Sequence, residues 1–333
     1  MKKLSIYVVA VLISIVTLFS SFTPKNEISN NPPLNTLDEF ETLVNYLEEN
    51  GNFINSDAAP AIILADEVKK NLKNSKYLVV DVRSETWFEY GHIKNAVNVK
   101  TADLLTYFET KINSKDYDKI VLVCYSGQSA AYFTSLLRLA GFDNAYSMKW
   151  GMSSWRADFA ENSWEKNVKN DFASKLETTD NAKPAKGSHP VLNTGKTEGK
   201  DILRVQLEKA FATPYKESII KSADVFATPG DYFTINYCAK DRYDKGHIPG
   251  AIQYQPKSLA STNDLYTLPV DKRIAVYGLT GQNTAYVVAY LDVLGYDAGN
   301  IAYGANSFMT KELKANGWDA FTKKQINMYP VVE

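Results

Sequence analysis

The chain has 333 residues, a hydrophobic share of 45%, a charged share of 23% and a formal net charge of -1. This is the composition of an ordinary globular protein, and the length exceeds what one hydrophobic core usually serves, so we expect two domains. Lysine and arginine are spread along the chain, which disfavours nucleic-acid binding and binding to an anionic membrane surface.

The N-terminus has the pattern of an export segment. A basic start, Met1-Lys2-Lys3, precedes an apolar run over residues 4–22. The run is nearly long enough to span a bilayer and the small-residue cleavage pattern after it is weak, so residues 1–24 are predicted to be either an export signal or an uncleaved membrane anchor. The expected location is periplasmic or otherwise extracytoplasmic.

Residues 25–57 are predicted to be a polar spacer that carries an amphipathic helix over residues 37–49. After them the chain contains two stretches with the same order of features, about 155 residues apart. The strand pattern that begins at Tyr77 and the Gly-His-Ile motif at His92 return at Tyr232 and His247. We interpret the chain as a tandem duplication.

Each copy alternates short β-branched runs with helical patterns, and the helical pattern that follows the central strand ends at Gly141 or Gly295. This predicts an α/β fold of two tandem domains, each a small, mostly parallel sheet with helices on both faces. We place the domains at residues 58–166 and 201–333, with a polar linker over residues 167–200.

Cys124 stands where the central strand of the first copy ends and a short loop leads into a helix. A thiol does sulfur chemistry as a thiolate, and successive loop amides together with a helix N-terminus can converge on one anion. We therefore predict that Cys124 is a catalytic nucleophile at the mouth of this domain. The predicted anion-binding loop is Tyr125, Ser126, Gly127, Gln128, Ser129 and Ala130.

Two alternatives for Cys124 are less well supported by the pattern. Most free cysteines are small buried hydrophobes, but few of those lie between a strand and a glycine-containing turn. A disulfide with Cys238, the only other cysteine, would join different predicted domains. The three histidines are not at metal-ligand spacing from a cysteine, so we expect no metal and no cofactor.

Taken together, these motifs resemble the rhodanese (sulfurtransferase) superfamily in a tandem arrangement. The resemblance covers roughly residues 58–160 and 200–325. It rests on Asp81-Val82-Arg83, on Gly91-His92-Ile93 followed by Ala96-Val97-Asn98, on the loop Cys124 to Ser129, and on Trp150-Gly151-Met152 with Trp155. It implies that Cys124 accepts a sulfane sulfur as a persulfide and passes it to a nucleophilic acceptor.

The loop is short and carries no cation. Between Tyr125 and Tyr132 there is no Arg or Lys, whereas the related cell-cycle phosphatases have a longer loop that closes on an arginine. Phosphate and arsenate chemistry is therefore disfavoured. Many relatives that use thiosulfate also carry cationic loop residues, so polysulfide, persulfide and other low-charge donors are candidates beside thiosulfate.

The remaining motif residues are interpreted mainly as scaffold. The resemblance implies that Asp81 and Arg83 form a structural ion pair near the loop, and both histidine motifs are expected to be architectural. Trp150 is a candidate for the pocket wall, with core packing as the alternative. Arg138, on the helix after the loop, is expected on a solvated face.

The second copy lacks the nucleophile. Gly278 stands where Cys124 stands in the first copy, and Cys238 falls at the counterpart of Arg83, where we expect it to be packed. This domain is predicted to be inactive. Three roles remain open for it: closing the cleft, stabilising the first domain, or binding a partner.

The sequence leads to two hypotheses. In the first, the protein is an exported sulfurtransferase that moves sulfane sulfur from thiosulfate, polysulfide or persulfide to a thiol or cyanide acceptor. In the second, it is a non-enzymatic module that senses sulfur or redox state, or binds a protein partner, through Cys124. Multiple turnover would distinguish the two.

Overall fold

The computed structural model describes residues 38–333. The predicted export signal or anchor over residues 1–24 lies outside the described residues, as does the start of the spacer. Within residues 38–333, no helix combines the length and the apolar character needed to cross a membrane.

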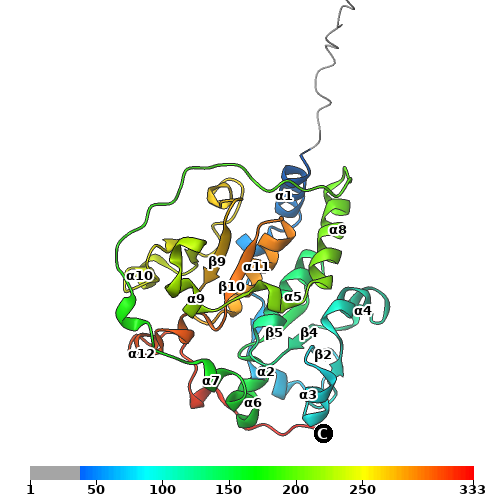
Figure 1. The fold of residues 1–333 in the computed structure, drawn as a ribbon. Helices are drawn as coiled ribbons and strands as arrows, with labels where there is room; N and C mark the ends of the chain where they lie inside the picture. The colour runs from blue at the N-terminus through cyan, green and yellow to red at the C-terminus, as the bar shows by residue number, and fades with distance from the viewer. Residues whose placement is uncertain (1–37) are drawn as a thin grey trace, which may run out of the picture. The chain divides into compact units, whose positions relative to one another are not determined.

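Two five-stranded parallel sheets form the framework (Figure 1). The first has the order β1-β5-β4-β2-β3 and the second the order β6-β10-β9-β7-β8. The first sheet comprises β1 (Ile62–Ile63), β2 (Tyr77–Asp81), β3 (Val97–Asn98), β4 (Lys119–Val123) and β5 (Ala145–Met148). The second comprises β6 (Ile219–Ile220), β7 (Tyr232–Asn236), β8 (Ile252–Gln253), β9 (Arg273–Tyr277) and β10 (Ala298–Ile301). The predicted α/β class with two parallel sheets is confirmed.

Helices accompany both sheets. Those up to residue 167 are α1 (Glu39–Glu49), α2 (Ala65–Lys70), α3 (Glu85–Tyr90), α4 (Leu104–Thr110), α5 (Gln128–Leu139), α6 (Ala157–Glu161) and α7 (Trp164–Asn167). Those that follow are α8 (Gly199–Ala212), α9 (Ser222–Ala227), α10 (Lys240–Tyr243), α11 (Gln282–Val293) and α12 (Thr310–Ala315). Below, the first half is residues 58–166 and the second half is residues 201–333.

The central strands distribute their side chains between two cores. In β4, Ile120 and Leu122 lie in the core shared by both halves, whereas Val121 and Val123 lie in a core of the first half alone. This is the alternation expected of a strand covered by helices on both faces. Cys124, the next residue, continues the register of Ile120 and Leu122 and belongs to the shared core.

The shared core is built around α5 and α11, which pack side by side (Figure 1). Each of the two helices buries residues around most of its circumference. A helix that is apolar on most sides is stable only when it is enclosed, so each half encloses the central helix of the other. The two predicted domains are therefore joined by a continuous hydrophobic core.

Three segments outside the sheets also pack against the halves. Helix α1, where the amphipathic helix was predicted, packs Phe40 against Tyr296 of the second half, with ring centroids 5.9 Å apart. In the predicted linker, Phe172 stacks on Phe226 at 4.4 Å. At the C-terminus the chain returns to the first half, where Pro330 O accepts a hydrogen bond of 2.9 Å from Trp155 Nε1.

Two side chains test the sequence interpretation. Arg138 is buried, which corrects the expectation of a solvated face; its Nε donates to Ala145 O at 2.7 Å and its guanidinium lies over the ring of Tyr146.

Cys238 is packed, as expected. Burial raises the pKa of the Cys238 thiol to about 12, which makes it a poor nucleophile at neutral pH.

Asp292 of α11 has a partly buried carboxyl group at the contact between the two central helices. Tyr132 Oη of α5 donates to Asp292 Oδ2 at 2.7 Å, and Ser218 Oγ donates to the same oxygen at 3.2 Å. Burial nevertheless raises the pKa of Asp292 from its ordinary 3.8 to about 7. Because the folded state favours the protonated form, its stabilising contribution is complete below pH 3.8 and is lost as the pH rises through 7.

We therefore predict that Asp292→Asn stabilises the protein at pH 8 by on the order of 2–4 kcal/mol and has little effect at pH 4, because asparagine stays neutral. Urea unfolding at both pH values measures the difference. The matched control is Asp271→Asn at an exposed position. A stability difference for Asp292→Asn that is the same at both pH values would contradict the prediction.

Candidate active site

The loop between β4 and α5 directs two backbone amides at the sulfur of Cys124. Gly127 N–H donates to Cys124 Sγ at 3.1 Å, and Ala130 N–H donates to it at 3.4 Å. Helix α5 begins at Gln128, because Gly127 adopts a left-handed φ of 88° that turns the chain into the helix. The result is a small nest of backbone donors around the sulfur, an arrangement suited to an anion.

A 3-10 turn, η4 (Gly151–Ser154), packs against this loop and donates hydrogen bonds to its carbonyl groups. Met152 N donates to Cys124 O at 2.8 Å, and Ser153 Oγ donates to Tyr125 O at 2.9 Å. Gly151 has a φ of 58°, and a Cβ there would lie 2.5 Å from both Cys124 O and Gly127 N. The turn can approach the loop this closely only because residue 151 is glycine.

The sulfur is enclosed rather than placed at an open mouth. Cys124 is 2% exposed, which corrects the expected placement. The physical reason is the strand register, which points Cys124 toward the face that packs against the second half. Burial raises the pKa of Tyr215 and of Tyr303, both from the second half, and the nearby charge of the Cys124 sulfur adds to the rise in each.

Asp81 and Arg83 lie next to the loop as a buried ion pair. Arg83 Nη2 contacts Asp81 Oδ2 at 2.7 Å with both side chains fully covered, and the same nitrogen donates to Gly91 O at 2.7 Å. The guanidinium lies over the rings of Phe159 and Tyr125. Because Asp81 neutralises Arg83, this arginine supports the scaffold and adds little positive potential to the loop.

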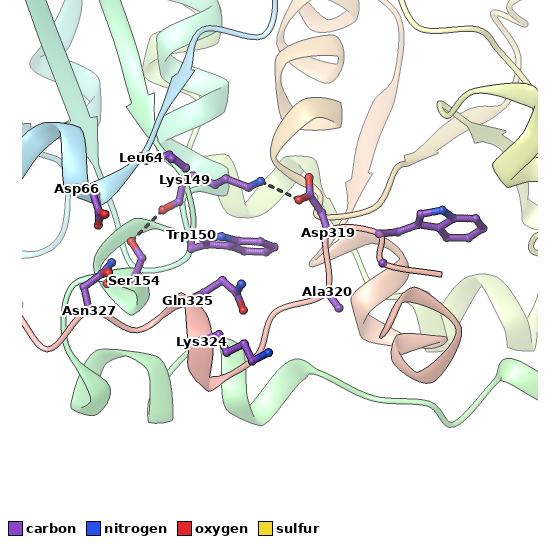
Figure 2. A pocket seen from close by; sticks show the side chains of 13 residues that line it. Leu64, Asp66, Lys149, Trp150, Ser154, Asp319, Ala320, Lys324, Gln325 and Asn327 are labelled. Atoms are coloured by element: carbon purple, nitrogen blue, oxygen red, sulfur yellow. Dashed lines mark hydrogen bonds and ion pairs between the residues drawn. The ribbon is translucent and has the colours of Figure 1, made fainter. Parts of the chain in front are cut away.

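Trp150 is mostly core. Its ring packs against Trp164 at 4.7 Å and Phe321 at 5.4 Å. It also walls a polar pocket of about 340 Å³, shown in Figure 2, where the Lys149 side chain reaches across to Asp319 at 2.8 Å. The residues that line this pocket do not include Cys124, so Trp150 borders a pocket other than the sulfur site.

The corresponding loop of the second half has the same backbone path without a thiol. Gly281 repeats the left-handed φ of Gly127, at 73°. A Cβ added at Gly278 would lie 3.3 Å from Thr284 Cγ2. Thr284 stands where the first half has Ala130, so its methyl group packs tightly against the position that the β-carbon of a side chain at residue 278 would take.

Three residues near the sulfur come from the second half and were not predicted: Tyr215, Gln282 and Tyr303. The sequence carried one usable signal for Gln282, because Gly127-Gln128 and Gly281-Gln282 occupy corresponding places in the two stretches that we interpret as a duplication. Only the packing of α5 against α11 shows that each loop faces the other half.

Fold and site together define a parallel α/β protein with a cysteine held by loop amides at the end of its central strand. A family model for the rhodanese-like domain matches residues 64–158. The thiosulfate sulfurtransferase GlpE of Shewanella oneidensis is 36% identical over 78 residues, which are 23% of this chain and 73% of that relative. The enzyme of the same name from Pseudomonas savastanoi is 30% identical over 96 residues, or 28% of this chain and 87% of the relative.

The chain belongs to the rhodanese family. This membership supports sulfurtransferase activity at the level of the family. The crystal structure of a rhodanese-related protein from Thermoplasma volcanium is also similar, with 23% identity, a TM-score of 0.25 and coverage of 30% of this chain and 91% of that one.

We predict that Gly151→Ala displaces the loop, because the added methyl group cannot fit between two backbone atoms. We expect a loss of about 3 kcal/mol in the free energy of unfolding and slower alkylation of Cys124, measured by urea unfolding and by mass mapping of alkylated peptides. Gly317→Ala is the matched control, with a φ of 65° and no atom within 4 Å of the added Cβ. Equal effects of the two substitutions would show that backbone strain alone, and not the fit of η4 against the loop, explains the result.

Proposed function

We propose that the protein is an exported sulfurtransferase that moves sulfane sulfur from a donor to a thiol or cyanide acceptor through a persulfide on Cys124. The observation that carries the proposal is the donation of two loop amides to Cys124 Sγ, at 3.1 and 3.4 Å, in a loop without cations. The part of the proposal that concerns export rests on the sequence pattern of residues 1–24 alone.

The proposed reaction is a double displacement. The Cys124 thiolate attacks the sulfane sulfur of the donor, a new S–S bond forms, and the donor group leaves with the electron pair of the bond that breaks. The acceptor nucleophile then attacks the outer sulfur, and the Cys124 thiolate leaves. In the second step the S–S bond of the persulfide breaks while the outer sulfur forms an S–S bond with a thiol or a C–S bond with cyanide. No external oxidant or reductant is needed, because each bond that breaks is matched by one that forms. The amides of Gly127 and Ala130 are suited to stabilise the anionic sulfur before and after each transfer.

The charge of the site bears on the choice of donor. The loop from Tyr125 to Ala130 has no charged side chain, and Arg83 is neutralised by Asp81. A dianionic donor such as thiosulfate gains little from such a site beyond amide hydrogen bonds. The names of the relatives support thiosulfate, whereas the neutral loop supports polysulfide or persulfide, and we include all three in the proposal.

A second candidate function is favoured by the burial of the thiol between the halves. A persulfide formed once at this position would add an atom inside the shared core and would alter the packing there. A module of that kind would sense sulfur or redox state, or change its affinity for a protein partner, without turnover.

For the enzyme, we predict that wild-type protein gains the mass of one sulfur atom when it is incubated with thiosulfate or polysulfide, and that Cys124→Ser does not. The protein is reduced before the donor is added, and intact-mass spectrometry without further reductant measures the gain. Cys238→Ser is the control and should behave as wild type, because Cys238 is buried and its thiol has a raised pKa. The proposal fails if wild type with reduced Cys124 gains no sulfur from any donor class.

Turnover separates the two candidate functions. An enzyme should release many equivalents of thiocyanate per protein from cyanide and a donor, and Cys124→Ser should abolish this release. A single equivalent of bound sulfur without release would favour the sensing module. Comparing thiosulfate with polysulfide in the same assay ranks the donors.

A further inference from the structure

Two glutamines cross between the halves at the facing ends of α5 and α11. Gln282 begins α11, is 1% exposed, and makes all of its side-chain hydrogen bonds to the backbone of the first half. Gln128 begins α5 and reaches in the opposite direction, where its Oε1 accepts from Tyr303 N at 2.7 Å and from Asn300 Nδ2 at 3.3 Å. Only the loop that Gln282 contacts contains a thiol.

The amide of Gln282 joins the two pieces of backbone that build the sulfur site. Its Oε1 accepts from Trp150 N at 2.8 Å, and its Nε2 donates to Gly127 O and to Met148 O, both at 3.3 Å. Trp150 leads directly into η4, the turn that packs against the loop. Gln282 therefore bonds both to the loop and to the strand end and turn that support it.

The Gln282 amide packs so closely against the α-carbon of Gly127 that residue 127 has no room for a side chain. A Cβ added at Gly127 would lie 2.2 Å from Gln282 Nε2. Gly127 is also the residue whose N–H makes the shorter of the two hydrogen bonds to Cys124 Sγ. The Gly127 N–H and the Gly127 carbonyl belong to the two peptide units that meet at the Gly127 α-carbon. Gln282 packs against this α-carbon and bonds to the carbonyl, and both contacts restrict the position of Gly127 and of the N–H that it directs at the sulfur.

We propose that Gln282 is a positioning residue for the nucleophile, supplied by the half that lacks one. The inference rests on the proposed sulfur transfer at Cys124 and assigns a role in it to the second half. Gln282 acts through Gly127 and the Trp150 turn, not by touching the donor. The Gln282 amide is buried, so it would lose its hydrogen-bond partners if the two halves shifted relative to each other. The loop around Cys124 therefore takes its ordered geometry only when the halves are correctly docked.

The test replaces Gln282 with methionine, which has a similar shape and no amide. We expect Gln282→Met to slow persulfide formation on Cys124 by about tenfold, the factor that corresponds to one net hydrogen bond. We also expect the midpoint of the pH dependence of Cys124 alkylation by iodoacetamide to rise by roughly half a pH unit to one unit, because a less well directed amide stabilises the anionic sulfur less.

Gln206→Met is the matched control. Gln206 of α8 is also a buried glutamine, and its Nε2 donates to Val293 O at 3.0 Å, at the opposite end of α11. This variant should also lose stability, because the hydrogen bond to Val293 O is removed. It should keep the alkylation midpoint of wild type, and its persulfide rate should stay within about twofold of wild type, since no bond to the loop is removed.

Two results would overturn the inference: an unchanged alkylation midpoint in Gln282→Met, or an equal change in Gln206→Met. If Gln282→Met does not fold, Gln282→Asn serves instead, because its shorter side chain withdraws the amide from Gly127 O. Failure of the proposed function is distinguishable, since it appears as the absence of persulfide in wild type. The alkylation profile tests the role of Gln282 even then.

Discussion

The packing of α5 against α11 is the constraint on which the site depends. Both helices are buried around most of their surface. Either half alone would therefore expose the apolar side chains of its central helix to solvent. The same packing covers the face of β4 to which Ile120, Leu122 and Cys124 contribute. The enclosure of the thiol is thus a direct consequence of how the two hydrophobic faces are buried.

Backbone groups, and not charged side chains, define the chemistry of the site. The sulfur accepts hydrogen bonds from Gly127 N and Ala130 N, while the nearest ion pair, between Asp81 and Arg83, is internally neutral. Amide donors are fixed by the fold and have no titration of their own. Such a site is suited to a compact anion with one negative charge, such as a thiolate or a persulfide, and lacks the bidentate cation that phosphate binding uses.

The sequence predicted what depends on local pattern. The order of strands and helices, the parallel sheets and the loop that opens with Cys124 follow from periodicity and from the glycines at 127 and 141, because these act within a few residues. The buried state of Arg138 was missed, since nothing nearby in the sequence shows that Ala145 O and the Tyr146 ring lie against its helix. The enclosure of Cys124 was missed for the same reason, because it depends on contacts between residues more than 100 positions apart, such as the one between Gln282 and Gly127.

The second half contacts the sulfur site although its own corresponding loop has no thiol. In that loop Thr284 Cγ2 would lie 3.3 Å from a Cβ added at Gly278. The side-chain polar atoms of Gln282, the first residue of α11, are satisfied only across the interface, by Trp150 N, Gly127 O and Met148 O. A buried amide without partners would cost about 1–3 kcal/mol, so the interface stabilises one docking geometry above others. Because that geometry is also the one in which Gly127 N–H meets Cys124 Sγ, the stability of the interface and the order of the sulfur site have the same physical cause.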